Sequence, residues 1–167
     1  RLDIKTFLST NNIYGTILVG EEGLNGTISG NDNNIDKVII FLKKIAGFED
    51  LDVKYSYSDK NPFVRLKIKL KKEIVTMGQP DVDPKARTGH YVCPSDWNKM
   101  LQDPDVVVID TRNNYEVDIG TFKGALNPNT ESFREFPIWW EKNKDQFQNK
   151  SVAMFCTGGI RCEKSTN

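Results

Sequence analysis

The sequence predicts a mixed α/β fold in two units, an α+β unit followed by a unit built on a parallel sheet. In the first 76 residues, short strand patterns alternate with two amphipathic helix patterns. Further along, two continuous apolar runs, Val106–Ile109 and Ser151–Phe155, are separated by helical sequence. Such runs are typical of strands buried on both faces of a parallel sheet. The length of 167 residues fits one large domain or two small ones.

The first unit, residues 1–76, is predicted from its order of elements. The expected elements are a helix over 2–10, a strand from Tyr14 to Val19, a turn at 22–26, extended chain at 27–29, a helix from 30–32 to Gly47, and strands at Val53–Tyr57 and Phe63–Leu70. This order fits a ferredoxin-like (acylphosphatase-like) βαββαβ unit that lacks its first strand. That strand would precede Arg1, and the chain starts without Met, so we expect a fragment.

Residues 77–93 are rich in glycine and proline and show little periodicity, so they are predicted to be a linker, with a short strand at Gly89–Val92. His90 in this stretch is interpreted as a surface or loop histidine rather than a general base. The second unit, residues 94–167, is expected to contain a helix from Pro94 to Leu101, a strand at Val106–Ile109, a loop punctuated by Gly120 and Gly124, an aromatic-rich helical region from Phe133 to Phe147, and a strand at Ser151–Phe155.

Composition excludes several functional classes. Hydrophobic residues make up 38% of the chain, charged residues 28%, and the net charge is zero, so only local patches could attract a polyanion. No apolar run is long enough for a membrane span. The three cysteines lack zinc-site spacing, and their odd number argues against a disulfide framework. A reducing, cytoplasmic location follows as an expectation.

The predicted strand at 63–70 carries basic residues on one face and apolar residues on the other. The basic set is Arg65, Lys67, Lys69 and Lys71. Four cations on one face of a strand are candidate contacts for nucleic-acid phosphates. The alternative is a solvated sheet face whose lysines protect an edge.

The most informative segment is the loop that follows the last predicted strand. Cys156 comes directly after the apolar run and is followed by Gly158, Gly159 and Arg161. A strand, a tight loop and a helix start create a nest of backbone N–H groups that stabilises a negative charge. The pKa of the Cys156 thiol should therefore fall, which leaves a nucleophilic thiolate. The alternative is a buried structural cysteine.

The length of this loop indicates its chemistry. Cys156 to Arg161 is a Cys-x4-Arg loop of six residues, one shorter than the Cys-x5-Arg loop of cysteine phosphatases. A tighter ring suits a persulfide sulfur better than a phosphoryl group. We expect its N–H donors and its guanidinium to come from the following residues: Thr157, Gly158, Gly159, Ile160 and Arg161.

Four residues around the loop are expected to support it. Arg161 holds the thiolate or orients the loop, or else forms a salt bridge with a carboxylate. Cys162 is either a resolving thiol or a packing residue. Asp110 and Arg112 are expected to form a structural ion pair that braces the loop. Glu116 is assigned to Arg112 as its i,i+4 partner.

Two sets of motifs carry a resemblance to known families. Asp110-Thr111-Arg112, Tyr115-Glu116 and Gly120-x-x-x-Gly124-Ala125 resemble the first signature of rhodanese-like domains, which more often has His and Ile where this chain has Thr121 and Phe122. Three further stretches resemble the bacterial oxygen-dependent tRNA uridine hydroxylases. They are Glu21–Ile28, Thr88–Asn98 and Phe155–Lys164.

This resemblance implies a function that the residues alone do not. It implies oxygen-dependent conversion of the wobble uridine to 5-hydroxyuridine, with tRNA as partner through its anticodon region and molecular oxygen as co-substrate. No bound cofactor, metal or membrane is expected. In that family the cysteine matching Cys156 is the essential one. From the activated thiol, and not from the resemblance, we hypothesise that a thiolate or persulfide adds to uracil C6 and makes C5 electron-rich toward an oxidant. The resemblance also implies that the rhodanese-like domain at 94–167 is truncated after its loop and that a C-terminal extension is missing. The alternatives are a rhodanese sulfurtransferase, acting through a Cys156 persulfide, and a non-catalytic binding module on the same fold.

Overall fold

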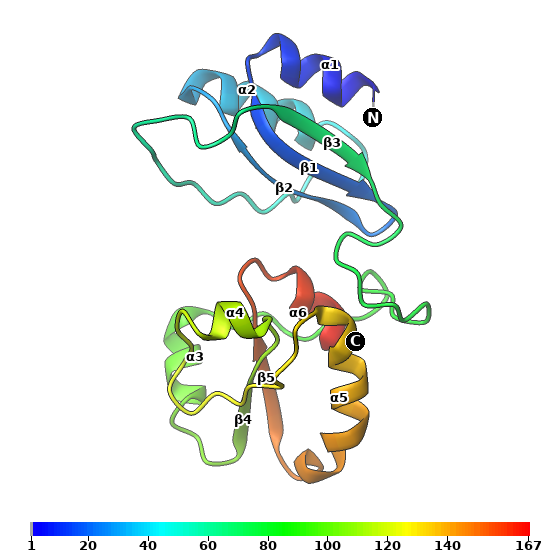
Figure 1. Ribbon diagram of the computed structural model, residues 1–167, viewed down its shortest axis with the longest axis vertical. Helices are drawn as coiled ribbons and strands as arrows, with labels where there is room; N and C mark the ends of the chain where they lie inside the picture. Colours follow the sequence, from blue (N-terminus) through cyan, green and yellow to red (C-terminus); the bar gives the residue numbers. More distant parts are fainter. Residues whose placement is uncertain (1) are drawn as a thin grey trace. The chain divides into compact units, whose positions relative to one another are not determined.

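The computed structural model describes residues 2–167, and the chain divides into two compact units at Ile74 and Val75 (Figure 1). Arg1, the first residue of the predicted first unit, lies outside the described residues. Among the described residues, no helix is long and apolar enough to cross a membrane. The mixed α/β fold class predicted from the sequence is confirmed.

The first unit is a three-stranded sheet covered on one face by two helices (Figure 1). Its elements are α1 (Leu2–Thr10), β1 (Tyr14–Gly20), β2 (Gly23–Ser29), α2 (Asp32–Lys43) and β3 (Leu66–Leu70). In the order β2-β1-β3, β1 pairs antiparallel with β2 and parallel with β3. The core lies between the helices and the sheet, where Leu8, Ile17 and Val38 are among the fully buried side chains.

The glycines predicted as a turn at 22–26 lie mostly in β2. The hairpin turn is only Glu21-Glu22, and Gly26 stands opposite Ile17 in the ladder. A Cβ on Gly26 would lie 2.2 Å from the carbonyl oxygen of Thr16, and one on Gly15 would lie 2.2 Å from that of Thr27. These two glycines therefore allow a close backbone approach between β1 and β2, and the turn prediction was wrong for residues 23–26.

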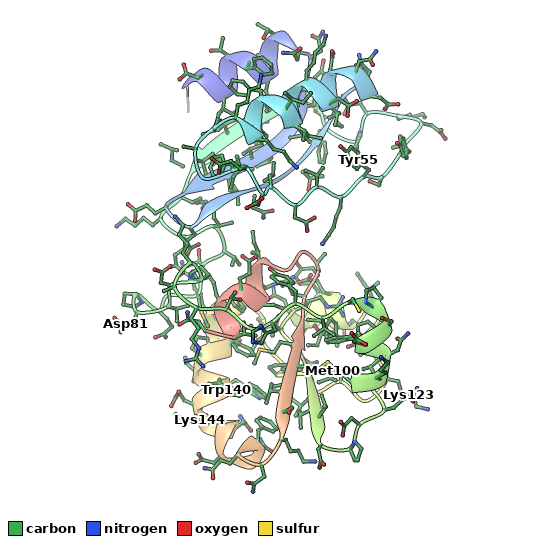
Figure 2. All side chains as sticks on the ribbon, turned by 180° about the vertical axis from the view of Figure 1, so that it is seen from behind. Tyr55, Asp81, Met100, Lys123, Trp140 and Lys144 are labelled. Carbon is green, nitrogen blue, oxygen red and sulfur yellow. The ribbon has the colours of Figure 1, made fainter. Side chains whose placement is uncertain are left out.

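The predicted strand at Val53–Tyr57 does not form. This stretch has no regular secondary structure, and Tyr55 (labelled in Figure 2) and Tyr57 are exposed. A strand needs a neighbour for its N–H and C=O groups, and none of the three strands of this sheet pairs with these residues. The last strand is also shorter than predicted, because β3 begins at Leu66 and Val64 is almost fully exposed.

The second unit has two parallel strands, β4 (Val106–Asp110) and β5 (Ser151–Phe155), with helices on both sides (Figure 1). The helical elements are α3 (Pro94–Met100), α4 (Asn114–Val117), the 3-10 turn η1 (Phe133–Glu135), α5 (Phe136–Asn143), the 3-10 turn η2 (Lys144–Phe147) and α6 (Ile160–Ser165). The single helical region predicted from Phe133 to Phe147 is thus divided in three. Pro137 falls in the first turn of α5, where a missing N–H costs least.

Apolar side chains cover both faces of this small sheet. On one face Ile109 packs with Phe136 and Phe147, and Trp140 of α5 stacks on Phe147 (Figure 2). On the other face three aromatic rings form a cluster in which every pair is within 6.0 Å between centroids: Trp97, Phe122 and Phe155. The strand that carries the cysteine loop is therefore held from both sides.

The predicted linker, residues 77–93, belongs to the second unit and contacts it at several separate points. Met77 is buried in the core of that unit. The N–H of Gly89 donates a 2.8 Å hydrogen bond to Thr166 Oγ1, just beyond α6. The short strand predicted at Gly89–Val92 is absent. Gly89 and Tyr91 bond to Thr166 and to Glu163 of α6, and no strand of the described residues pairs with this segment.

Candidate active site

The cysteine loop starts where the two parallel strands end together. Asp110 and Phe155 are partners in the register of β4 and β5. The next residue on the β4 side, Thr111, donates from both its backbone N–H and its Oγ1 to the Phe155 carbonyl, each at 3.0 Å. The carboxyl edge of a parallel sheet is where such folds bind ligands, and these bonds hold the two loops beside each other.

Cys156 lies in a nest of N–H donors at this edge. Its Sγ accepts a 3.0 Å hydrogen bond from the N–H of Gly159, whose φ of 86° turns the chain into α6. The Cys162 thiol also donates to it, and this bond is the largest cause that lowers the pKa of Cys156 to about 5. Backbone N–H groups add to the effect, while burial opposes it. At neutral pH this arrangement holds a thiolate.

Cys162 has the opposite titration behaviour. Its pKa is raised, because its proton is donated to the Cys156 thiolate and because the group is largely buried. Thr111 Oγ1 lies 3.7 Å from its Sγ. Of the two cysteines, Cys156 is therefore the thiolate and Cys162 the thiol. Cys162 thus acts as a hydrogen-bond donor as well as a packing residue.

Arg161 and Glu116 form a bidentate ion pair beside the loop. Nη1 to Oε2 is 2.6 Å and Nη2 to Oε1 is 2.7 Å. The hydroxyl of Thr157 donates to the same carboxylate at 2.5 Å. The hydrogen bonds from Arg161 are the main cause that lowers the pKa of Glu116 to about 2. The prediction that Glu116 pairs with Arg112 was wrong, since α4 turns this side chain toward the loop.

Arg112 pairs instead with Asp110, two residues away. Nε to Oδ1 is 2.9 Å and Nη2 to Oδ2 is 2.7 Å, and Arg112 also donates to the Gly120 carbonyl at 2.6 Å. Thr121 Oγ1 donates to Asp110 at 2.8 Å. Burial alone would raise the pKa of Asp110, but these hydrogen bonds lower it. The Arg112 guanidinium lies 5.3 Å from the ring centre of Phe155, the residue before Cys156.

The four basic residues predicted as nucleic-acid contacts lie in β3 or next to it. Ile68 is buried under the helices, so Lys67 and Lys69 point to the opposite, open face of the sheet. The register places them beside Thr16 and Leu18 of β1. Arg65 precedes the strand and Lys71 follows it. These four residues belong to the first unit and the cysteine loop to the second.

Sequence reasoning missed two contacts at the loop. Thr157 was predicted only as a backbone N–H donor, yet its hydroxyl donates a hydrogen bond to Glu116. Tyr91, in the predicted linker, donates a 2.5 Å hydrogen bond to Glu163 of α6. The resemblance in Thr88–Asn98 was the signal that pointed to this segment. Within residues 2–167, no group of three His, Cys, Asp or Glu side chains is placed to hold a metal ion.

The fold and the loop define a class of protein, in which a small α+β unit precedes an α/β unit with an activated cysteine at the carboxyl edge of its sheet. Comparison with known proteins supports both halves. Residues 1–74 match the family described as the UPF0176 acylphosphatase like domain, which agrees with the predicted fold of the first unit.

Three relatives cover both units, and each is named tRNA uridine(34) hydroxylase. The chain is 59% identical to the protein of Roseobacter denitrificans and 61% to that of Ruegeria pomeroyi, in each case over 93% of this chain and 52% of the relative. Identity to the Picosynechococcus protein is 55% over 98% of this chain and 55% of the relative. The chain is similar to these proteins, as its motifs predicted, and spans about half the length of these relatives.

Proposed function

We propose that this chain carries the reactive cysteine of a tRNA-modifying enzyme that converts the wobble uridine to 5-hydroxyuridine. The relatives are named for hydroxylation of uridine 34 of tRNA. The motifs around Cys156 resemble those of that family. The observation that carries the proposal is the Cys156 thiolate in its N–H nest, with its pKa near 5. An aromatic C–H bond needs activation before it reacts, and a thiolate beside the base supplies it.

The proposed chemistry starts with addition of the Cys156 thiolate to C6 of uracil. The S–C6 bond forms while the C5–C6 double bond opens, and its electrons make C5 an enolate carbon. Molecular oxygen then accepts these electrons and forms a C5 hydroperoxide. Two electrons from a thiol reductant cleave its O–O bond, leaving hydroxyl on C5 and releasing water with a disulfide. Loss of the C5 proton expels the thiolate and restores the double bond.

The proposed partner is tRNA, bound through its anticodon region. The open sheet face of the first unit offers cations to the phosphates in Lys67 and Lys69, with Arg65 and Lys71 at the ends of the same strand. Phosphate contacts of this kind make binding weaker at higher salt. A tRNA substrate and three free cysteines together support a cytoplasmic location.

The test is nucleoside analysis of tRNA from cells whose full-length protein carries Cys156→Ser. We expect 5-hydroxyuridine to disappear, because serine has no thiolate at neutral pH. Cys93→Ser is the matched control, since the Cys93 thiol is exposed and bonds with Ser95 and Asp96 at the start of α3. Unchanged 5-hydroxyuridine in the Cys156→Ser cells, with no second enzyme present, would reject the proposal.

A second candidate function is transfer of sulfane sulfur through a Cys156 persulfide. The six-residue loop and the acidic thiol favour it, because both suit a persulfide as well as a thiolate. It predicts fast thiosulfate:cyanide turnover by the full-length protein. A non-catalytic binding module, the third reading, has no use for a cysteine held as a thiolate.

A further inference from the structure

Tyr91 is an aromatic side chain at the rim of the cysteine loop that the proposed chemistry leaves without a role. The residue is 74% exposed, so it contributes little to the core. Its hydroxyl lies over the loop, 3.8 Å from the position a Cβ would take on Gly159. Gly159 in turn donates its N–H to Cys156 Sγ at 3.0 Å. The Tyr91 hydroxyl thus lies next to Gly159, whose N–H holds the reactive sulfur of Cys156.

Several hydrogen bonds fix the backbone that carries Tyr91. Before it, Gly89 donates to Thr166 at 2.8 Å. Upstream of Gly89, the carbonyls of Asp83 and Arg87 accept hydrogen bonds from the side-chain amide of Asn167, at 2.9 and 2.8 Å. The segment is therefore tied to the end of α6 at separate points. Because α6 starts in the cysteine loop, Tyr91 is held in a fixed place relative to Cys156.

The side chain is fixed as well as the backbone. The Tyr91 hydroxyl donates a 2.5 Å hydrogen bond to Glu163 of α6. Burial of the hydroxyl and this carboxylate raise the pKa of Tyr91, so the phenol keeps its proton beside the thiolate. An aromatic ring that is held at its tip and open to solvent along its face is suited to stacking. Flat bases stack on such rings whatever their hydrogen-bonding edges.

We propose that Tyr91 is the stacking platform that holds the target base over the Cys156 thiolate, with Glu163 as the residue that positions its ring. The inference rests on the proposed function, since it assigns the base of an unpaired nucleotide as the ligand of this rim. Single-stranded loops present such bases, whereas a paired base is covered by its neighbours. Stacking would fix the plane of the uracil, so that the sulfur approaches C6 from one face.

The first measurement is binding of two anticodon stem-loop RNAs to the full-length protein, one with uridine at the wobble position and one abasic there. For the unsubstituted protein we expect the uridine RNA to bind more tightly. Tyr91→Ala should reduce this preference by about 5- to 100-fold, the range for loss of one base–aromatic stack. Tyr91→Phe should retain most of it, because the ring remains. Ile138→Ala, which removes an exposed apolar side chain on α5, is the matched control and should have no effect.

The second measurement separates base stacking from support of the loop. Alkylation of Cys156 by iodoacetamide without RNA should change less than about threefold in Tyr91→Ala, while 5-hydroxyuridine in cellular tRNA falls. An unchanged preference for the uridine RNA in Tyr91→Ala would overturn the inference. The inference would also be overturned if the alkylation rate of Cys156 in Tyr91→Ala fell by the same factor as the 5-hydroxyuridine level, because the ring would then act by supporting the loop.

Failure of the proposed function gives a different pattern. In that case Cys156→Ser leaves 5-hydroxyuridine unchanged, whatever Tyr91 does. The preference for uridine over the abasic RNA still decides whether Tyr91 binds a base. Loss of that preference in Tyr91→Ala supports the platform, and its persistence rejects it.

Discussion

Two arginine–carboxylate pairs stand at the same edge of the second unit's sheet and have different consequences for the chain. Both are bidentate, with shortest N–O distances of 2.7 Å for Arg112–Asp110 and 2.6 Å for Arg161–Glu116. The first joins residues two apart and has a fully buried carboxylate. The second joins residues 45 apart, and both of its partners keep a little contact with solvent.

The Arg112 pair is therefore a local contact, whereas the Arg161 pair connects two segments that are far apart in the sequence. The Arg112 pair stabilises the chain that leaves β4, and it reaches the cysteine only through the ring of Phe155. The Arg161 pair connects α4 directly to the loop that holds the thiolate. We therefore expect the first pair to contribute more to stability and the second more to the reactivity of Cys156.

The largest effect is expected from Arg112→Leu. It leaves the buried Asp110 carboxylate without its charge partner, and such a loss costs about 3–5 kcal/mol in free energy of unfolding. Urea unfolding followed by tryptophan fluorescence measures it for this unit alone, because all three tryptophans lie there. Lys144→Leu breaks an exposed pair with Glu141 and should leave the free energy of unfolding nearly unchanged. Equal losses in the two variants would contradict the comparison.

Glu116→Gln is expected to cost less in stability, about 1–3 kcal/mol, because water can reach both partners. It should also change the acid response. The pKa of Glu116 is lowered to about 2 from its ordinary 4.5, so its contribution is complete above pH 4.5 and is lost as the pH falls toward 2. The variant should therefore lose less stability than the parent between these values. Urea unfolding at a series of pH values tests this.

A matched control is Glu141→Gln, which removes a carboxylate from the exposed pair with Lys144. Its acid response should follow that of the parent. If Glu116→Gln also follows the parent, the long-range pair contributes nothing to the pH dependence of folding.

The two pairs also show which contacts of this structure can be predicted from the sequence and which cannot. The local pair was predictable, because residues two apart at the end of a buried strand have few other partners. The long-range pair was not, since Glu116 and Arg161 meet only when α4 and the cysteine loop lie at the same edge. The sequence likewise predicted both sheets and the thiolate nest. It missed the fixed position of Tyr91, because glycine- and proline-rich chain looks like a linker until its contacts with α6 are known.

Alkylation of Cys156 should follow the hydrogen bond from Cys162. With a pKa near 5, the rate with iodoacetamide should be almost constant from pH 6 to 8 and should fall below pH 5. Cys162→Ala removes the largest cause of the low pKa and should move this inflection to higher pH. In a Cys93→Ser background, peptide mass spectrometry distinguishes Cys156 from Cys162, because trypsin cleaves between them at Arg161. The Arg112→Leu variant should keep the parent inflection. A shift in that variant as large as the shift in Cys162→Ala would contradict the expectation that the Arg112 pair contributes to stability rather than to the reactivity of Cys156.

The smallest effect is expected from the glycines of the loop itself. Gly159 has a φ of 86°, a region that costs an alanine about 1 kcal/mol or more, and a Cβ there would make only ordinary contacts. At its neighbour Gly158 a Cβ would meet nothing within 4 Å and φ is not in that region, so Gly158→Ala should leave the free energy of unfolding nearly unchanged. Both substitutions change the same loop by one methyl group. A difference between them in urea unfolding thus measures the strain that the turn into α6 imposes on an alanine, and equal values would show that the turn imposes none.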